Sequence, residues 1–179
     1  MTPVSSLQSV FLAVGDGAHH AERLVPDASH LPALVMVPLL AGVFLVPLLG
    51  LARRRLAYVA TLVIIAAYAA TAIFALVSVL GEGVQRYRMA GWPPPLGIEL
   101  SLDALSAFVI VTISVVSLMV AIYAGAAVRL ENPQREVPFF ALMIIMLLGL
   151  SGMVMTADLF NLYVFLEVSS LAGYALMAV

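Results

Sequence analysis

The chain has 179 residues, of which 64% are hydrophobic and 10% charged, with a mean hydropathy of +1.13. This composition lies outside the range of soluble globular proteins and predicts an integral membrane protein. The absence of cysteine excludes disulfides, thiolate metal sites and iron–sulfur ligation within the chain, and a net charge of −2 offers no basic face for nucleic acid. The three histidines precede the first apolar run, so none is placed to hold a haem between helices. We therefore expect no cofactor and no nucleic-acid partner.

Residues 1–30 are polar enough to form an N-terminal tail outside the bilayer. The tail contains His19, His20 and Glu22, which could bind a metal. The ligand number and spacing of a metal site are missing, so we expect solvated tail residues and no metal. No basic residue precedes the short apolar run at residues 10–14, which argues against a cleaved signal peptide.

Five apolar runs follow, each long enough to cross a membrane as a helix. They cover residues 31–51, 56–80, 102–128, 138–155 and 159–179. We therefore predict an all-α, polytopic membrane helix bundle of about five transmembrane helices. The first helix should bend, because Pro38 and Pro47 each remove a backbone donor inside it.

The longest internal loop, residues 81–101, is predicted to form a short hairpin-like structure. Consecutive prolines after Trp92 fix polyproline II geometry, and the tryptophan suits the headgroup layer. The alternation of residues 96–100 predicts a small strand. Ser101 is the expected N-cap of the next helix, with Asp103 in its first turn.

Small residues on two of the predicted helices indicate close packing. Ser106, Ser114 and Ser117 share one face of the third helix, and that face is expected to pack against a neighbour. In the fourth helix, Gly149 and Gly152 permit the close approach of another helix.

The distribution of arginine predicts the orientation, because all eight basic residues are arginines. By the positive-inside rule, the short loop at residues 53–55 is cytoplasmic. The N-terminal tail is then external and the end of the chain cytoplasmic. The chain stops within its last apolar run, without a helix-ending glycine or proline. We interpret it as the N-terminal portion of a longer protein or one half of a split subunit.

Glu167 is the candidate functional residue. Tyrosines aside, it is the only ionisable side chain deep inside an apolar run. It follows Asp158 by nine residues, about 13 Å of helix, which places it near the midplane of a bilayer core about 30 Å thick. A carboxylate at that depth is costly unless it is neutral, paired or hydrated, so by default it marks an ion path.

The neighbours of Glu167 form a narrow polar stripe. Steps of three and four residues along the helix reach Phe160, Tyr163, Ser170 and Tyr174. Such a stripe belongs against protein or water. The supporting candidates for proton translocation are Tyr163, Ser170, Tyr174, Asp158 and Asp103. The alternative is a structural glutamate that is only hydrogen-bonded within a bundle, and the alternative for Asp103 is helix capping.

Three motifs carry a resemblance to a known family. They are GWPPPLGIEL at residues 91–100, LDALS at residues 102–106 and, above all, DLFNLYVFLE at residues 158–167. Over residues 31–179 the sequence resembles the proton-conducting antiporter-like membrane subunits. The nearest branch is the D subunit of the Mrp cation/proton antiporters, whose relatives include membrane subunits of complex I and of membrane-bound hydrogenases.

The resemblance implies a membrane subunit of a multisubunit Na⁺/H⁺ antiporter in the inner cell membrane, with Glu167 as proton carrier. In the family this glutamate faces a lysine on a later helix. This sequence has no lysine, so another subunit or missing later spans would have to supply it. Other membrane subunits, the lipid bilayer, H⁺ and Na⁺ are the expected partners. One alternative is a proton-pumping subunit of a membrane-bound hydrogenase or of a complex I-like NADH-quinone oxidoreductase, which would make it part of a translocase. The other alternative is a scaffold fragment without transport.

Overall fold

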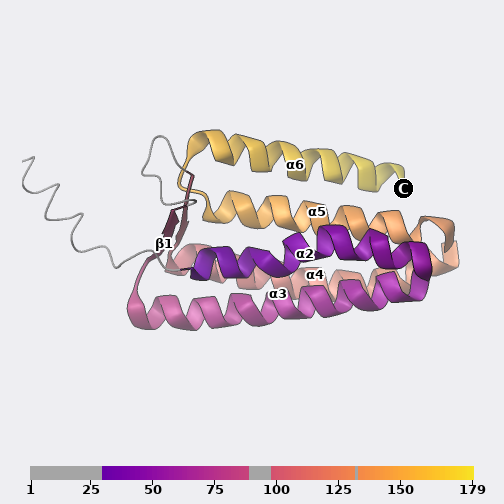
Figure 1. Cartoon of the computed structure of the whole chain (residues 1–179), viewed down its shortest axis with the longest axis horizontal. Coiled ribbons are helices and arrows are strands. Elements are labelled where there is room, and N and C mark those ends of the chain that lie inside the picture. The colour runs from indigo at the N-terminus through magenta and orange to yellow at the C-terminus, as the bar shows by residue number, and fades with distance from the viewer. Residues whose placement is uncertain (1–29, 89–97, 132) are drawn as a thin grey trace, which may run out of the picture.

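The computed structural model describes residues 30–88, 98–131 and 133–179 (Figure 1). These residues form five helices long and apolar enough to cross a membrane, which confirms the predicted all-α membrane bundle. The helices are α2 (Leu31–Ala52), α3 (Arg54–Glu82), α4 (Ala104–Glu131), α5 (Glu136–Met155) and α6 (Leu159–Ala178). Residues 1–29 of the expected tail (residues 1–30) and the proline-rich segment after Trp92 lie outside the described residues.

A two-stranded antiparallel hairpin covers one end of the bundle (Figure 1). Strand β1 (Gln85–Arg88) pairs with β2 (Glu99–Leu102), so that Gln85 lies opposite Leu102. The turn between α5 and α6 is attached to this hairpin, because Leu100 forms an isolated bridge with Thr156 and the Ala157 amide donates to the Glu99 carbonyl at 3.0 Å. The strand therefore lies slightly later than the predicted 96–100.

The start of α4 differs from the prediction. Ser101 belongs to β2, so it cannot cap the helix. The cap is Asp103, whose Oδ1 accepts a hydrogen bond of 2.7 Å from the Ser106 amide. The correction has a simple cause, since strand pairing holds Ser101 in extended backbone and α4 starts only at Ala104, directly after Asp103.

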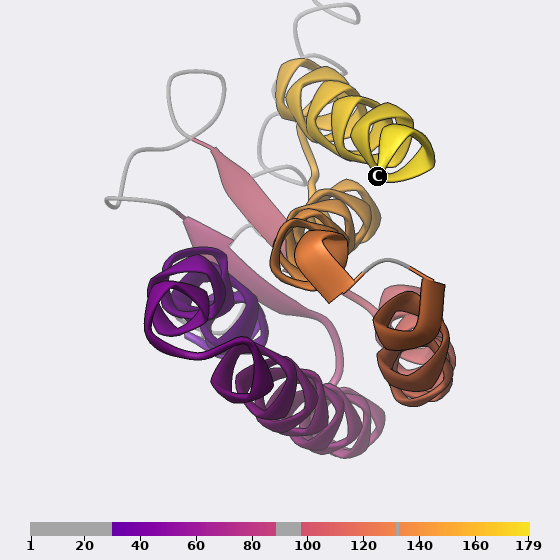
Figure 2. The same cartoon turned by 90° about the vertical axis from the view of Figure 1, so that its right-hand side faces the viewer.

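Helix α5 lies at the centre of the bundle, where it packs against α2, α3, α4 and α6 (Figure 2). Among the described elements, α6 packs mainly on α5 and lies at the edge of the bundle. Helix α2 remains helical through Pro38 and Pro47, and Figure 1 shows a sideways step in its path, as expected from two interior prolines.

The buried face of α4, which packs against α3 and α5, consists mostly of small residues. On α4 the buried set is Ala107, Ile110, Ser114, Ser117, Ala121, Ala124 and Gly125. This confirms the packing role predicted for Ser114 and Ser117, whose hydroxyls donate to backbone carbonyls one turn earlier. Small side chains let the two backbones approach closely, which is how helices associate in lipid.

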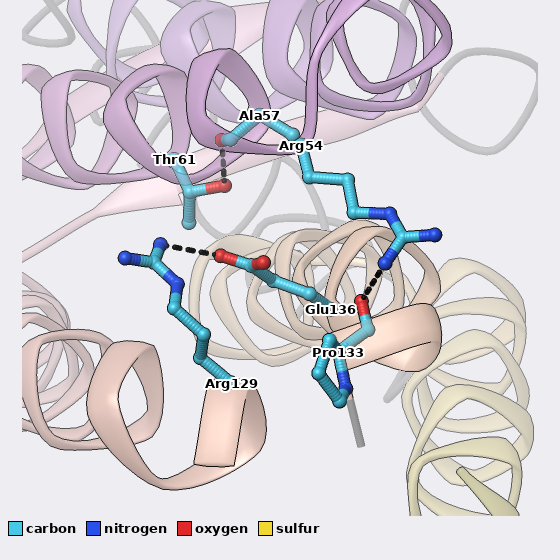
Figure 3. A network of polar contacts seen from close by, with 6 residues as sticks. All are labelled: Arg54, Ala57, Thr61, Arg129, Pro133 and Glu136. Atoms are coloured by element: carbon cyan, nitrogen blue, oxygen red, sulfur yellow. Dashed lines mark hydrogen bonds and ion pairs between the residues drawn. The ribbon is translucent and has the colours of Figure 1, made fainter. Parts of the chain in front are cut away.

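Polar contacts close the opposite end of the bundle, where a short 3-10 turn (Pro133–Arg135) joins α4 to α5 (Figure 3). Arg129 Nη2 donates to Glu136 Oε1 at 2.7 Å, and Arg54 Nη1 donates to the Pro133 carbonyl at 2.9 Å. The Arg129 guanidinium also lies 5.3 Å above the ring of Tyr58. These contacts attach the α4–α5 turn to the start of α3.

Candidate functional site

The candidate site lies on α6, whose first turn is fixed by side-chain capping. Asp158 Oδ1 accepts a hydrogen bond of 3.1 Å from the Phe160 amide. Within the same turn, Asn161 Nδ2 donates to Thr156 Oγ1 at 3.0 Å. Asp158 therefore acts as the N-cap, which satisfies a backbone donor and favours the helix dipole.

Two glycines of α5 set the distance between α5 and α6. A Cβ atom on Gly149 would lie 2.9 Å from the Ser169 backbone nitrogen, and one on Gly152 would overlap the Phe165 ring. The Ser169 backbone cannot turn aside, so the approach at Gly149 requires glycine, whereas at Gly152 the Phe165 ring would have to rotate. The close approach predicted from these glycines is confirmed, and its partner is α6.

This packing also fixes the rotation of α6 about its own axis. Asn161, Ser169 and Ala172 are the buried residues of the helix. Because successive residues turn by about 100°, Glu167 lies about 160° around the helix from Ser169. Its side chain therefore projects from the face that points away from α5, where it is half-buried.

The aromatic neighbours of Glu167 stand on the same outward face. Phe160, Tyr163 and Tyr174 are 73%, 60% and 66% exposed. The Tyr163 hydroxyl interacts with the Glu167 carboxylate one helical turn away. Ser170, half-buried, completes the stripe on the C-terminal side.

The other two supporting candidates do not join this stripe. Asp158 caps α6 about 13 Å before Glu167, at 1.5 Å per residue. Asp103 caps α4, where hydrogen bonds from the Ser106 backbone and then its side chain hold the pKa of Asp103 below its ordinary value. Both carboxylates thus have a structural contact of their own at a helix start.

Ion pairs do not reach Glu167 within the part of the chain that the structure describes. The pairs found there join Arg86 and Arg88 to Glu99 at one end of the bundle, and Arg129 to Glu136 at the other. Helix α6 itself carries no basic residue. A cation that meets Glu167 would have to approach its outward face.

Sequence comparison gives relatives of two kinds. No protein-family model matches the chain. The N subunit of the NADH-quinone oxidoreductase of Desulforudis audaxviator is 43% identical over 155 residues, which cover 84% of this chain and 30% of that protein. The D subunit of the Na⁺/H⁺ antiporter of Bacillus subtilis is 33% identical over 100 residues, which cover 56% of this chain and 20% of that protein.

Solved structures agree with these relatives. A chain of an archaeal membrane-bound sulfane sulfur reductase, a respiratory membrane complex, matches with a TM-score of 0.76 and 32% identity over 82% of this chain. A chain of the Mrp complex from Dietzia sp. DQ12-45-1b matches with a TM-score of 0.71 and 30% identity over 83% of this chain. The chain belongs to the antiporter-like membrane subunits. It spans 30% and 27% of the two structurally similar chains.

Sequence reasoning missed two buried carboxylates of this antiporter-like subunit. Glu99 is 6% exposed and lies 3.4 Å from Arg86 Nη1 and 3.7 Å from Arg88 Nε. Glu136 is 3% exposed and pairs with Arg129. The alternating pattern around Glu99 could have revealed the first of them, because it predicted a strand. In a paired strand, Glu99 lies beside the arginines of the neighbouring strand. No comparable local signal marked Glu136, which follows a polar loop.

Proposed function

We propose that this chain is a membrane subunit of a multisubunit monovalent cation/proton antiporter and that Glu167 carries the proton. The observation that carries the proposal is the placement of a half-buried carboxylate at the ninth of the 20 residues of α6, on the face turned away from α5. A carboxyl group held at the middle of a span is costly as a charge, so it belongs to an ion path.

The chemistry follows from the surroundings of the carboxyl group. Low-dielectric surroundings favour the protonated form, and a cation brought near favours the carboxylate. A lysine on another helix of the assembly, moving toward and away from Glu167, would therefore drive proton release and uptake. Tyr163, Ser170 and Tyr174 give the stripe hydroxyl groups that can relay a proton or hold water beside it.

A redox-driven proton pump is the second candidate function. It is favoured by the identity of 43% to the N subunit of an NADH-quinone oxidoreductase over 84% of this chain. In that assembly the same helices would move protons in response to electron transfer in other subunits. The two functions separate in sealed vesicles, because an antiporter responds to an imposed Na⁺ gradient whereas the pump responds to NADH or a quinol.

The proposed orientation follows from the arginine-rich connection between α2 and α3. We place the end of the bundle with Arg53, Arg54 and Arg55 on the cytoplasmic side of the inner membrane, following the positive-inside rule. Other membrane subunits then cover the outward face of α6, with H⁺ and Na⁺ as the transported ions.

Substitution of Glu167 tests the proton-carrier role. Glu167→Gln keeps the size and the hydrogen bonding but removes titration, so the complex should assemble at normal levels and lose exchange. Glu167→Asp should keep partial activity. The control is Asp103→Asn, because asparagine is also a good N-cap and the change should spare transport.

Transport is measured per amount of assembled complex, by pH-dependent dye quenching in membrane vesicles. Full exchange by the Glu167→Gln complex would eliminate the proton carrier and leave Glu167 as a structural contact in a subunit without transport. Loss of exchange in Asp103→Asn at normal assembly would instead move the path to the hairpin end of the bundle.

A further inference from the structure

The two ends of the bundle carry opposite net charges among the described residues. The end with the α2–α3 and α4–α5 connections has a net charge of +3, from Arg53, Arg54, Arg55, Arg129, Arg135, Glu131 and Glu136. The hairpin end has a net charge of −2, from Arg86, Arg88, Glu82, Glu99, Asp103 and Asp158. As far as the structure describes the two ends, the first is therefore the one suited to attract anions.

An apolar groove of about 780 Å³ opens at this positive end, between α2 and α5. Val43, Phe44 and Leu48 line it from α2, and Ala141 and Leu142 from α5. Phe44 and Leu48 are 74% and 61% exposed, so the groove faces the surroundings of the bundle and not its core. In a membrane those surroundings are lipid tails or another apolar helix.

Arg54 lies at the end of this groove, where the apolar lining meets the positive end of the bundle. Its Nη1 donates to the Pro133 carbonyl, which holds the guanidinium beside the turn that precedes α5 (Figure 3). A guanidinium has five N–H donors, and the contact with Pro133 engages one nitrogen. The N-terminus of α5 lies at the same end and adds positive potential.

We propose that this groove binds an anionic phospholipid, with the phosphate on Arg54 and an acyl chain along α2 and α5. Charge complementarity favours this occupant, because basic pockets between transmembrane helices bind phospholipid headgroups. An apolar helix from another subunit would cover the same lining but would leave Arg54 without an anion. Arginine, with its fork of donors, suits a phosphate group in particular.

The same arrangement predicts headgroup selectivity. Phosphatidylcholine and phosphatidylglycerol can carry the same acyl chains, so the groove treats their tails alike. They differ in net charge, and the surplus of arginines at this end favours phosphatidylglycerol. Lipid binding in this groove does not depend on whether Glu167 carries protons.

The test is native mass spectrometry of the chain, purified with its accompanying subunits in mild detergent and mixed with either lipid. We expect phosphatidylglycerol adducts on the original protein and an affinity about tenfold lower in Arg54→Gln, the loss expected for one charge-assisted hydrogen bond. The matched control is Arg55→Gln, which makes the same change in charge within the same arginine cluster but outside the groove, and should keep binding.

A second variant tests the acyl-chain half of the site without touching charge. Leu48→Trp fills the groove at an exposed position and should reduce binding of phosphatidylglycerol, whereas Leu80→Trp, at another exposed position, should not. Equal binding of the two lipids, or equal loss in Arg54→Gln and Arg55→Gln, would overturn the proposal. The proposal would also fail if the complex retained neither lipid and dissociated in the Leu48→Trp variant, because a partner helix would then occupy the groove.

Discussion

Replacement of Gly149 by alanine should force α6 away from α5. The added Cβ would lie 2.9 Å from both the backbone nitrogen and the Cβ of Ser169, and 3.0 Å from the Phe165 carbonyl oxygen. These atoms cannot rotate away, unlike the Phe165 ring that faces Gly152. Since ordinary contacts begin at 3.4 Å, the two helices must separate here by about 0.5 Å, the difference between 3.4 and 2.9 Å, to restore an ordinary contact.

The magnitude follows from a matched pair of glycines. Overpacking of a close contact costs about 1–3 kcal/mol. Alanine regains about 1 kcal/mol through helix propensity at either position, so this gain cancels between Gly149→Ala and Gly173→Ala. A Cβ at Gly173 on α6 would meet nothing within 4 Å. The two variants should therefore differ by about 1–3 kcal/mol, which for a chain of this size is about 2–12 °C in Tm.

The assay is thermal unfolding of the two variants and the original protein in the same detergent. Gly173→Ala should match or exceed the original Tm, and Gly149→Ala should fall below Gly173→Ala by the stated margin. Equal melting temperatures for the two variants would refute the reasoning, because α6 would then not be held against α5 at Gly149.

Two further predictions concern the core and the orientation. Tyr68→Phe removes the buried hydrogen bond of 2.7 Å between the tyrosine hydroxyl and Ser151 Oγ. It should lower the free energy of unfolding by about 0.5–1.5 kcal/mol, measured by thermal unfolding. The control Tyr123→Phe changes a side chain that is 75% exposed and should leave the stability unchanged. In intact cells, a cysteine in place of the exposed Glu82 should react with a membrane-impermeant maleimide. A cysteine in place of the exposed Gln134 should react only after permeabilisation. The reverse labelling would contradict the proposed orientation.

The sequence alone was enough to predict the class of protein and the position of Glu167 along the last helix. Hydropathy is a property of each residue, so runs of about 20 apolar residues predict membrane helices without knowledge of their neighbours. The position along the helix follows in the same way, because the rise per residue is constant and Asp158 marks the start of the last helix. The glycines of α5 likewise predicted a close helix contact, although not its partner.

The tertiary structure decided which way Glu167 faces and which side chains it meets. Periodicity places Glu167, Tyr163 and Tyr174 on one face of a helix, but only the packing of Gly149 against Ser169 turns that face away from α5. Such contacts join residues far apart in the chain, and their geometry depends on the shapes of both partners.

The same limit explains the other differences between sequence and structure. From its local sequence, Ser101 is expected to cap a helix. Its pairing with Arg86 places it in a strand, and Asp103 forms the cap instead. From its local sequence, Arg54 indicates only the membrane orientation. The fold places it at the end of a groove between α2 and α5. Local pattern gives each residue its possible roles, and the approach of distant segments selects among them.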